Sequence, residues 1–130
     1  MKFGYVISYV EDVSASLSFF SRAFGFEIRF LHDSGTYGEL SSGETTIAFA
    51  ADTLADGNFK GGHVAAHASS APLGMEIVLV TDDVAAAHLK AVACGAYEMS
   101  APTAKVWGQI VSYVRCPDGV LVELCTPVAP

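Results

Sequence analysis

Two glutamates stand inside apolar runs that are otherwise typical of buried strands. Glu76 opens the run Glu76–Thr81, and Glu123 lies within the run Val120–Cys125. An unpaired buried carboxylate is costly, so two such residues indicate a site rather than an ordinary core. Two carboxyl groups that face each other cannot both ionise cheaply, and either one keeps its proton or a cation lies between them. Glu123 and Glu76 are therefore the candidate catalytic residues, or the groups that recognise an amine or a guanidinium.

Alternation along the strands indicates which side chains share a face with these carboxylates. On the last strand Glu123 goes with Leu121 and Cys125, which leaves Val122 and Leu124 to pack on a helix. We expect an aromatic-walled cavity, with the two carboxylates pointing into it from opposing sheets. The residues predicted to contact a ligand are Tyr5, Ile7, Tyr9, Ala48, Phe49, Trp107, Gln109 and Tyr113. Tyr5, Tyr9, Phe49 and Tyr113 are each explained equally well as part of the core. Trp107 is more suggestive of a site, because Gly108 beside it lets another group approach the backbone closely.

The elements that position these residues repeat along the chain. In the first half, Asp12 is a predicted helix cap, apolar residues recur after it at helical spacing, and Gly25 ends the pattern. In the second half, Asp83 and Gly95 enclose a similar helix at 84–94. Each half reads as a strand, a helix and three more strands, which indicates an internal duplication. We predict an α+β fold in which two such modules form a curved, barrel-like mixed sheet around a central cavity.

The length of the chain indicates a single domain over residues 1–130. We place the first module at about 1–52, the connecting loop at about 53–73 and the second module at about 74–126. Within the loop, Asp52–Asn58 is predicted as a short helical turn. The part that follows is rich in Gly, Ala and Ser, and a loop of this length is usually functional or mobile.

Charge and cysteine content restrict the class of protein. The formal net charge is −7, and the seven Lys and Arg form no basic patch, which argues against nucleic-acid binding. No apolar run is long enough to span a bilayer, and the N-terminus has no signal-peptide pattern. The three scattered cysteines, Cys94, Cys116 and Cys125, fit a reducing compartment. We expect a cytoplasmic protein with no nucleic-acid or membrane partner.

Two segments resemble the glyoxalase / bleomycin-resistance / extradiol-dioxygenase superfamily, also called vicinal oxygen chelate proteins. The first segment is VEDVSASLSFF at 10–20, followed by AFGF at 23–26. The second is WGQ at 107–109, followed by YVRCPDGVLVEL at 113–124, in which Cys116 stands where an Asp is usual. The resemblance covers essentially the whole chain. It implies paired βαβββ modules and a homodimer.

Metal-dependent members of that superfamily hold a divalent ion with His and Glu side chains from four strands. The resemblance maps these positions onto Tyr5, Ala48, Glu76 and Glu123, and only Glu123 keeps the usual residue. Zinc and nickel favour imidazole and thiolate donors, so we expect no tightly bound transition metal and no other cofactor. Tyr5, Glu76 and Glu123 offer at most a weak site for a hard divalent ion such as Mg or Mn.

The histidines give a competing metal hypothesis. His63 and His67 have the i,i+4 spacing at which two imidazoles meet on a helix face. They lie in a Gly-, Ala- and Ser-rich loop with no acidic residue between them, so we interpret them as polar loop residues. His32, beside a turn, and His88, on a helix, are interpreted as structural or exposed.

Two functional classes stay open. The first is a binding protein that holds a small aromatic or cationic molecule, as bleomycin-resistance-type members sequester an antibiotic without a metal. The alternative is a lyase, isomerase or dioxygenase-type enzyme. In that enzyme Glu123 or Glu76 is a general base or a ligand of a weakly held divalent ion, and Tyr5 or Gln109 supplies a stabilising hydrogen bond. The missing histidines favour the binding protein.

Overall fold

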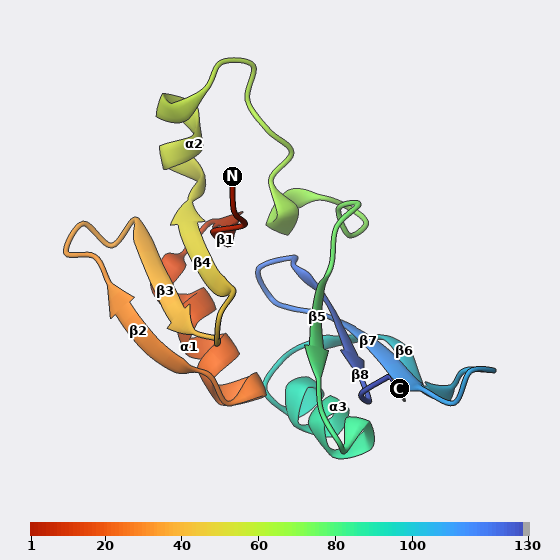
Figure 1. Cartoon of the computed structure of the whole chain (residues 1–130). Helices are drawn as coiled ribbons and strands as arrows, with labels where there is room; N and C mark the ends of the chain where they lie inside the picture. The colour runs from red at the N-terminus through yellow and green to blue at the C-terminus, as the bar shows by residue number, and fades with distance from the viewer. Residues whose placement is uncertain (129–130) are drawn as a thin grey trace. The chain divides into compact units, whose positions relative to one another are not determined.

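The computed structural model describes residues 1–128 of the chain, which divide into two compact units. The first unit ends at Ser69, and the second begins at Ser70. The first contains β1 (Tyr5–Val10), α1 (Val13–Phe24), β2 (Glu27–Leu31), β3 (Tyr37–Ser41), β4 (Thr46–Ala51), α2 (Asp52–Asn58) and the 3-10 helix η1 (Ala66–Ala68). The second contains β5 (Ile77–Val80), α3 (Val84–Ala93), β6 (Tyr97–Ala104), β7 (Ile110–Arg115) and β8 (Leu121–Cys125) (Figure 1). The predicted α+β fold of two βαβββ modules is confirmed.

The main helix of each unit begins at the predicted aspartate. The Asp12 carboxylate accepts a hydrogen bond of 3.0 Å from the backbone N–H of Ala15, and Asp83 accepts one of the same length from Ala86. These bonds satisfy backbone donors that have no partner inside the helix. Gly25 ends the first helix with φ at +80°, a conformation that glycine adopts without steric cost.

Each unit has its own mixed sheet of four strands. The strand orders are β1-β4-β3-β2 and β5-β8-β7-β6, so the first strand of a module always pairs with the last. These two pairs, β1 with β4 and β5 with β8, are parallel, and the other pairs are antiparallel. The parallel pairing brings the two ends of a module into adjacent strands, which decides where the candidate site residues lie.

One face of each sheet is packed against the helix of its own unit. In the first unit this core includes Phe20 and Phe49, whose ring centroids are 5.0 Å apart. In the second unit Val114, Val122 and Leu124 are buried, and α3 contacts β7 and β8. The prediction that Val122 and Leu124 pack on a helix is confirmed. The opposite face of each sheet is therefore the one that can present side chains to a ligand.

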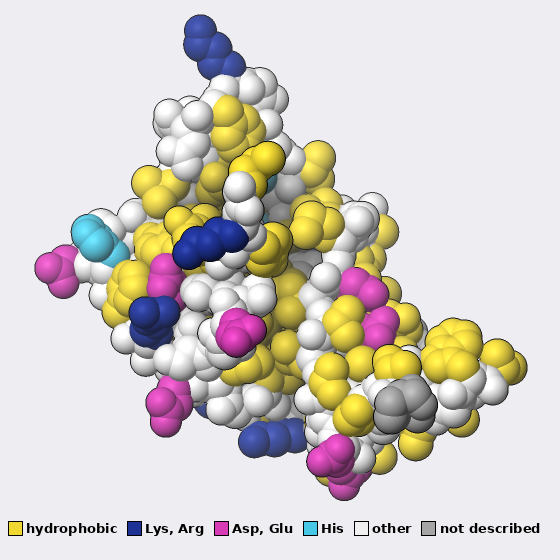
Figure 2. Space-filling view, in the orientation of Figure 1, with side chains coloured by type: hydrophobic (Ala, Val, Ile, Leu, Met, Phe, Trp, Pro, Cys, Tyr) yellow, Lys and Arg dark blue, Asp and Glu magenta, His cyan; other side chains and the backbone are white. Residues whose placement is uncertain are grey.

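The surface carries many apolar and few basic side chains. On the face that Figure 2 shows, Lys and Arg side chains stand singly among hydrophobic ones rather than in a patch. Large apolar side chains that are exposed include Phe30 on β2, Val78 and Val80 on β5, and Trp107 before β7. Among residues 1–128, no helix is long and apolar enough to cross a membrane.

Candidate functional site

Glu76 and Glu123 belong to the same sheet. Glu76 directly precedes β5, Glu123 is on β8, and these strands are parallel neighbours in which Val78 is the register partner of Glu123. Our expectation that the carboxylates point toward each other from opposing sheets is therefore wrong. They are adjacent because parallel pairing joins the first and last strands of one module.

The register places both carboxylates on the face away from the helix. Side chains two residues apart on a strand share a face, so Glu76 goes with Val78, the partner of Glu123. Val122 and Leu124, on either side of Glu123, are buried on the opposite face. Glu123 itself is half-buried, and Glu76 is exposed. The pair is open to a ligand from solvent.

A chain of hydrogen bonds connects three side chains on this face. Tyr113 lies directly opposite Glu123 on β7, and its phenol donates a bond of 2.9 Å to Oε1 of Glu123. The Glu76 carboxyl shares a hydrogen bond with Glu123, and a hydrogen bond between two carboxyl groups requires a proton on one of them. Glu123 is thus the acceptor for Tyr113, and its charge favours the protonated form of the neighbouring Glu76.

The electrostatics of the site agree with this assignment. Partial burial, the hydrogen bond to Glu123 and the charge of Glu123 raise the pKa of Glu76 above its ordinary value. The same carboxylate raises the pKa of Tyr113 to about 12, first through the hydrogen bond and then with a contribution from burial. Burial, with the charge of Glu123, also raises the pKa of the Cys125 thiol. Tyr113 and Cys125 therefore stay protonated near neutral pH, and the negative charge of this face is held by the two glutamates.

Trp107 and Gln109 form a separate polar contact in the second unit. The Trp107 indole N–H donates to the Gln109 side-chain oxygen at 2.8 Å, and the Gln109 amide donates to the Thr126 carbonyl at 2.9 Å. Trp107 is 64% exposed, so its ring is free to stack on a planar molecule. Gln109 uses its oxygen and one of its two N–H donors in these contacts, which orient its amide group.

The first unit places four of the predicted residues on one face of its sheet. The register pairs Ile7 with Ala48, and Tyr5 and Tyr9 lie two residues to either side of Ile7 on β1. Tyr5 and Ile7 are exposed, whereas Ala48 is fully buried and adds only backbone and a methyl group. Phe49 is the exception. It lies on the opposite face, fully buried against Phe20, so the prediction that Phe49 contacts a ligand is wrong.

The same face carries a tyrosine–glutamate pair that the sequence analysis missed. Glu39 on β3 is the register partner of Ala48, and it accepts a hydrogen bond of 2.7 Å from the Tyr37 phenol. Arg29 Nη1 lies 3.8 Å from Glu39 Oε1. Burial and Glu39 raise the pKa of Tyr37. The signal was the i,i+2 spacing of Tyr37 and Glu39 on one strand, which places both on the same face.

The residues at the metal positions do not fit a transition metal. Among residues 1–128, no three His, Cys, Asp or Glu side chains are arranged to hold an ion together. Ala48 has no donor atom, and Tyr5 offers only a phenol, which is a weak ligand while it is protonated. Glu76 and Glu123 remain as two carboxylates in the second unit. Such oxygen donors suit a hard ion or an organic cation better than zinc, nickel or iron.

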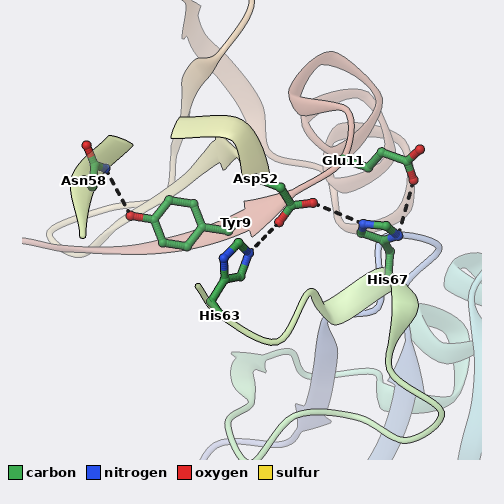
Figure 3. A network of polar contacts seen from close by, with 6 residues as sticks. All are labelled: Tyr9, Glu11, Asp52, Asn58, His63 and His67. Carbon is green, nitrogen blue, oxygen red and sulfur yellow. Dashed lines mark hydrogen bonds and ion pairs between the residues drawn. The ribbon is translucent and has the colours of Figure 1, made fainter. Parts of the chain in front are cut away.

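Three of the histidines have acidic partners that sequence spacing did not reveal. His63 and His67 both contact the Asp52 carboxylate, which lies at the start of α2 (Figure 3). His88 is buried, and its ring is held between Ser112 and Glu98. The interpretation of His88 as structural agrees with this position, whereas His63 and His67 are more than isolated loop residues.

Known proteins share this architecture. The family model of the Glyoxalase/Bleomycin resistance protein/Dioxygenase superfamily matches residues 2–124. A search of curated proteins found no match. A glyoxalase-related enzyme from Fulvimarina pelagi has a similar structure, with 20% identity, a TM-score of 0.81, and coverage of 98% of this chain and 88% of that one.

Two further solved structures are similar over nearly their whole length. A glyoxalase/bleomycin resistance protein/dioxygenase family enzyme from Burkholderia phytofirmans PsJN has 19% identity, a TM-score of 0.82, and coverage of 99% of this chain and 100% of that one. TioX from Micromonospora sp. ML1 has 17% identity, a TM-score of 0.72, and coverage of 97% and 98%. At these identities the structures establish the fold. Because the family model matches nearly the whole chain, this protein belongs to the Glyoxalase/Bleomycin resistance protein/Dioxygenase superfamily.

Proposed function

We propose that this protein binds a small organic molecule that carries a positive charge next to an aromatic or apolar group. The carboxyl pair of Glu76 and Glu123 is the recognition site. One observation carries the proposal: the two carboxyl groups are neighbours on one face of the sheet, where Glu76 is exposed and Glu123 is half-buried. Burial and the neighbouring Glu123 disfavour the ionised form of Glu76. A bound cation would favour that form instead.

The surroundings of the pair fit an ammonium or amidinium group. Such a group has several N–H donors, and two adjacent carboxylates together offer several acceptor positions for them. Tyr113 fixes one oxygen of Glu123, so the other oxygen and the Glu76 carboxyl stay available to the ligand. The exposed side chains of Val78 and Val80 lie on the same strand face and offer an apolar surface beside the charge. The cation would offset the repulsion between the two carboxylates.

Matched ligands test this proposal. Benzylamine and benzyl alcohol have the same ring and similar size, but only the amine is positively charged at pH 7. We expect calorimetry to show about tenfold tighter binding of the amine, which corresponds to one charge-assisted hydrogen bond. Glu123→Gln and Glu76→Gln should each remove most of this preference. Glu44→Gln is the control, because Glu44 is an exposed turn residue of the first unit. Equal affinity of the native protein for the two ligands would refute the proposal.

A second candidate function is general acid–base catalysis by the same pair. The raised pKa of Glu76 favours it, because a carboxyl group that keeps its proton closer to neutral pH can donate or accept one during a reaction. We propose proton abstraction from a carbonyl compound, as in a lyase or isomerase. A Glu76→Gln variant that binds the substrate normally and turns it over as fast as the native enzyme would exclude this role.

The remaining parts of the proposal concern the metal, the assembly and the compartment. We propose no resident transition metal, because the donor set is two carboxylates. A weakly held hard divalent ion remains compatible with them. We also propose a homodimer, which sedimentation would test, and a location in the reducing cytoplasm. The free thiols of Cys94, Cys116 and Cys125 support that location.

A further inference from the structure

Four ionisable side chains form a chain of contacts in the first unit (Figure 3). Asp52 Oδ1 lies 2.8 Å from His63 Nε2, and Asp52 Oδ2 lies 3.1 Å from His67 Nε2. On its other side His67 presents Nδ1 to Glu11 Oε2 at 3.3 Å. Glu11 follows β1 directly, Asp52 begins α2, and both histidines belong to the connecting segment. The contacts therefore fasten that segment to two elements of the first module.

The two nitrogens of the His67 ring both face carboxylate oxygens. A neutral imidazole has one N–H donor and one lone pair, whereas the imidazolium has two donors. Both contacts of His67, to Asp52 and to Glu11, are attractive only when the ring carries two protons. In the neutral ring one lone pair would face a carboxylate oxygen. His63 differs, because its contact with Asp52 needs a single donor and is made by the neutral ring as well.

The segment that these contacts hold down covers Tyr9. We call residues 59–68 the strap. The His63 ring centroid lies 5.3 Å from that of Tyr9, and Phe59 lies 6.4 Å from it. Just before the strap, the Asn58 amide donates a hydrogen bond of 3.3 Å to the Tyr9 hydroxyl. Tyr9 shares a strand face with Tyr5 and Ile7, so the strap shields one end of the row of side chains predicted to contact a ligand.

We propose that the strap is a pH-responsive cover, held over Tyr9 by protonated His67 and loosened when His67 loses a proton. The groups that face the two histidines are Asp52 and Glu11 at His67, and Asp52 and the Tyr9 ring at His63. Imidazoles ordinarily change their charge between pH 5 and 8, whereas aspartate and glutamate stay ionised over that range. The strap is thus fastened at mildly acidic pH and released at mildly alkaline pH.

The response is graded, because the contacts are partly solvated. The side chains of His67 and Asp52 are 30% and 22% exposed, and that of Glu11 is 77% exposed. Solvent weakens such ion pairs, so we expect a several-fold change in strap opening. The positive charge between the carboxylates of Asp52 and Glu11 comes from protonated His67 and not from a metal ion. Among the described residues no three His, Cys, Asp or Glu side chains are arranged to hold a metal. All residues of this network belong to the first unit, so the strap is independent of the function proposed for Glu76 and Glu123.

Hydrogen exchange of the strap amides tests the inference. Protection factors for residues 61–68, corrected for intrinsic exchange, should fall about fivefold between pH 5.5 and pH 8.0. His67→Gln places an uncharged amide that does not titrate at this position, so its protection factors should not vary with pH. Glu11→Gln should reduce the response by removing one of the two carboxylates. His32→Gln is the control, because His32 lies outside the strap and should keep the native response.

Two outcomes would overturn the inference. The first is a native strap whose protection factors agree within a factor of about two at both pH values. The second is a His67→Gln protein that keeps the native pH response. If that variant does not fold, Glu11→Gln decides the question, and an undiminished response in it refutes the proposal. Nitrogen NMR of the His67 ring gives an independent readout, since both ring nitrogens must carry protons at pH 5.5.

Discussion

Tyr113 and Glu123 are directly opposite each other on β7 and β8, and the Tyr113 phenol donates a hydrogen bond of 2.9 Å to the Glu123 carboxylate. That contact raises the pKa of Tyr113 to about 12, so the phenol keeps its proton and remains a donor at any pH near neutral. Glu123 is therefore the acceptor in this contact. Partial burial, with the hydrogen bond to Glu123 and the charge of Glu123, raises the pKa of the neighbouring Glu76.

The first prediction concerns Glu76 and pH. A carboxyl group whose pKa is raised by folding binds more protons in the folded than in the unfolded state at pH values above its ordinary pKa of 4.5. Its contribution to the free energy of unfolding is thus present at low pH and is lost as pH rises through the raised value. Glu76→Gln removes the ionisable group, so the variant does not lose this part of the free energy of unfolding as pH rises. We expect the variant to melt about 1–3 °C higher than the native protein at pH 7.5 and at the same temperature at pH 4.

Thermal denaturation followed by circular dichroism at the two pH values checks this prediction. The expected shift is small because Glu76 is exposed and solvent screens the repulsion between the carboxylates. Glu44→Gln is the matched control, since Glu44 is also exposed but lies in a turn of the other unit. A Glu76→Gln protein that melts below the native protein at pH 7.5 would show that the carboxyl pair stabilises the fold instead.

The fold could be predicted because its signals are local. Helix ends could be predicted because Asp12, Asp83 and Gly25 flank a helical pattern in the sequence. Alternation of apolar and polar residues identified most strands. Local signals are weaker for β6, which runs from Tyr97 to Ala104 and passes through a proline. As an edge strand, β6 tolerates a residue without a backbone N–H donor, and its register with β7 is irregular at that point.

The candidate site was harder to predict because its geometry depends on non-local pairing. Alternation gave the correct face for Glu123, but nothing in the local sequence shows that β5 pairs with β8. Phe49 was misplaced for another reason. Ala48 and Phe49 are both fully buried, so the strand carries no polar alternation from which its faces can be told apart.

The positions of the histidines in the sequence did not reveal their contacts either. Asp52 lies 11 residues before His63 and 15 before His67, and the chain must turn back before they meet. No helical or strand period relates these positions. The i,i+4 spacing of the two histidines suggested that they contact each other, whereas the structure makes the Asp52 carboxylate their common partner.

The second prediction concerns Gly38 on β3, which packs beneath α1. A Cβ atom added to Gly38 would lie 2.5 Å from Leu17 Cδ1 and 3.0 Å from the backbone oxygen of Phe30. Leu17 is buried in the core, so its side chain can shift only by displacing its neighbours. Gly38→Ala therefore forces the strand away from the helix, and we expect it to lower the free energy of unfolding by about 1–3 kcal/mol.

Urea denaturation of Gly38→Ala measures this loss, and Gly57→Ala is its control. Gly57 lies inside α2, and an added Cβ there meets nothing within 4 Å. Alanine favours a helix over glycine by roughly 0.5–1 kcal/mol, so the control should be unchanged or slightly more stable. If both variants unfold at the same urea concentration, the contact between β3 and α1 is looser than the structure indicates.

The third prediction concerns the buried contact between His88 and Ser112. The His88 ring lies between the Ser112 hydroxyl, at 2.9 Å from Nδ1, and the Glu98 carboxylate, at 2.7 Å from Nε2. A serine, a histidine and a carboxylate in this order resemble a hydrolase triad. Ser112 is fully buried, however, so its hydroxyl cannot reach a substrate. We infer that the three side chains join α3 to β6 and β7 and serve stability alone.

Ser112→Ala separates the structural role from the catalytic one. The substitution leaves a buried nitrogen of His88 without a partner, which should lower the free energy of unfolding by about 1–3 kcal/mol in urea denaturation. Ser100→Ala, at an exposed position on β6, should change stability by less than about 0.5 kcal/mol. The native protein should also resist covalent modification by fluorophosphonate reagents, which label activated serines. Labelling at Ser112 would mean that the hydroxyl becomes accessible and that the triad-like arrangement has a chemical function after all.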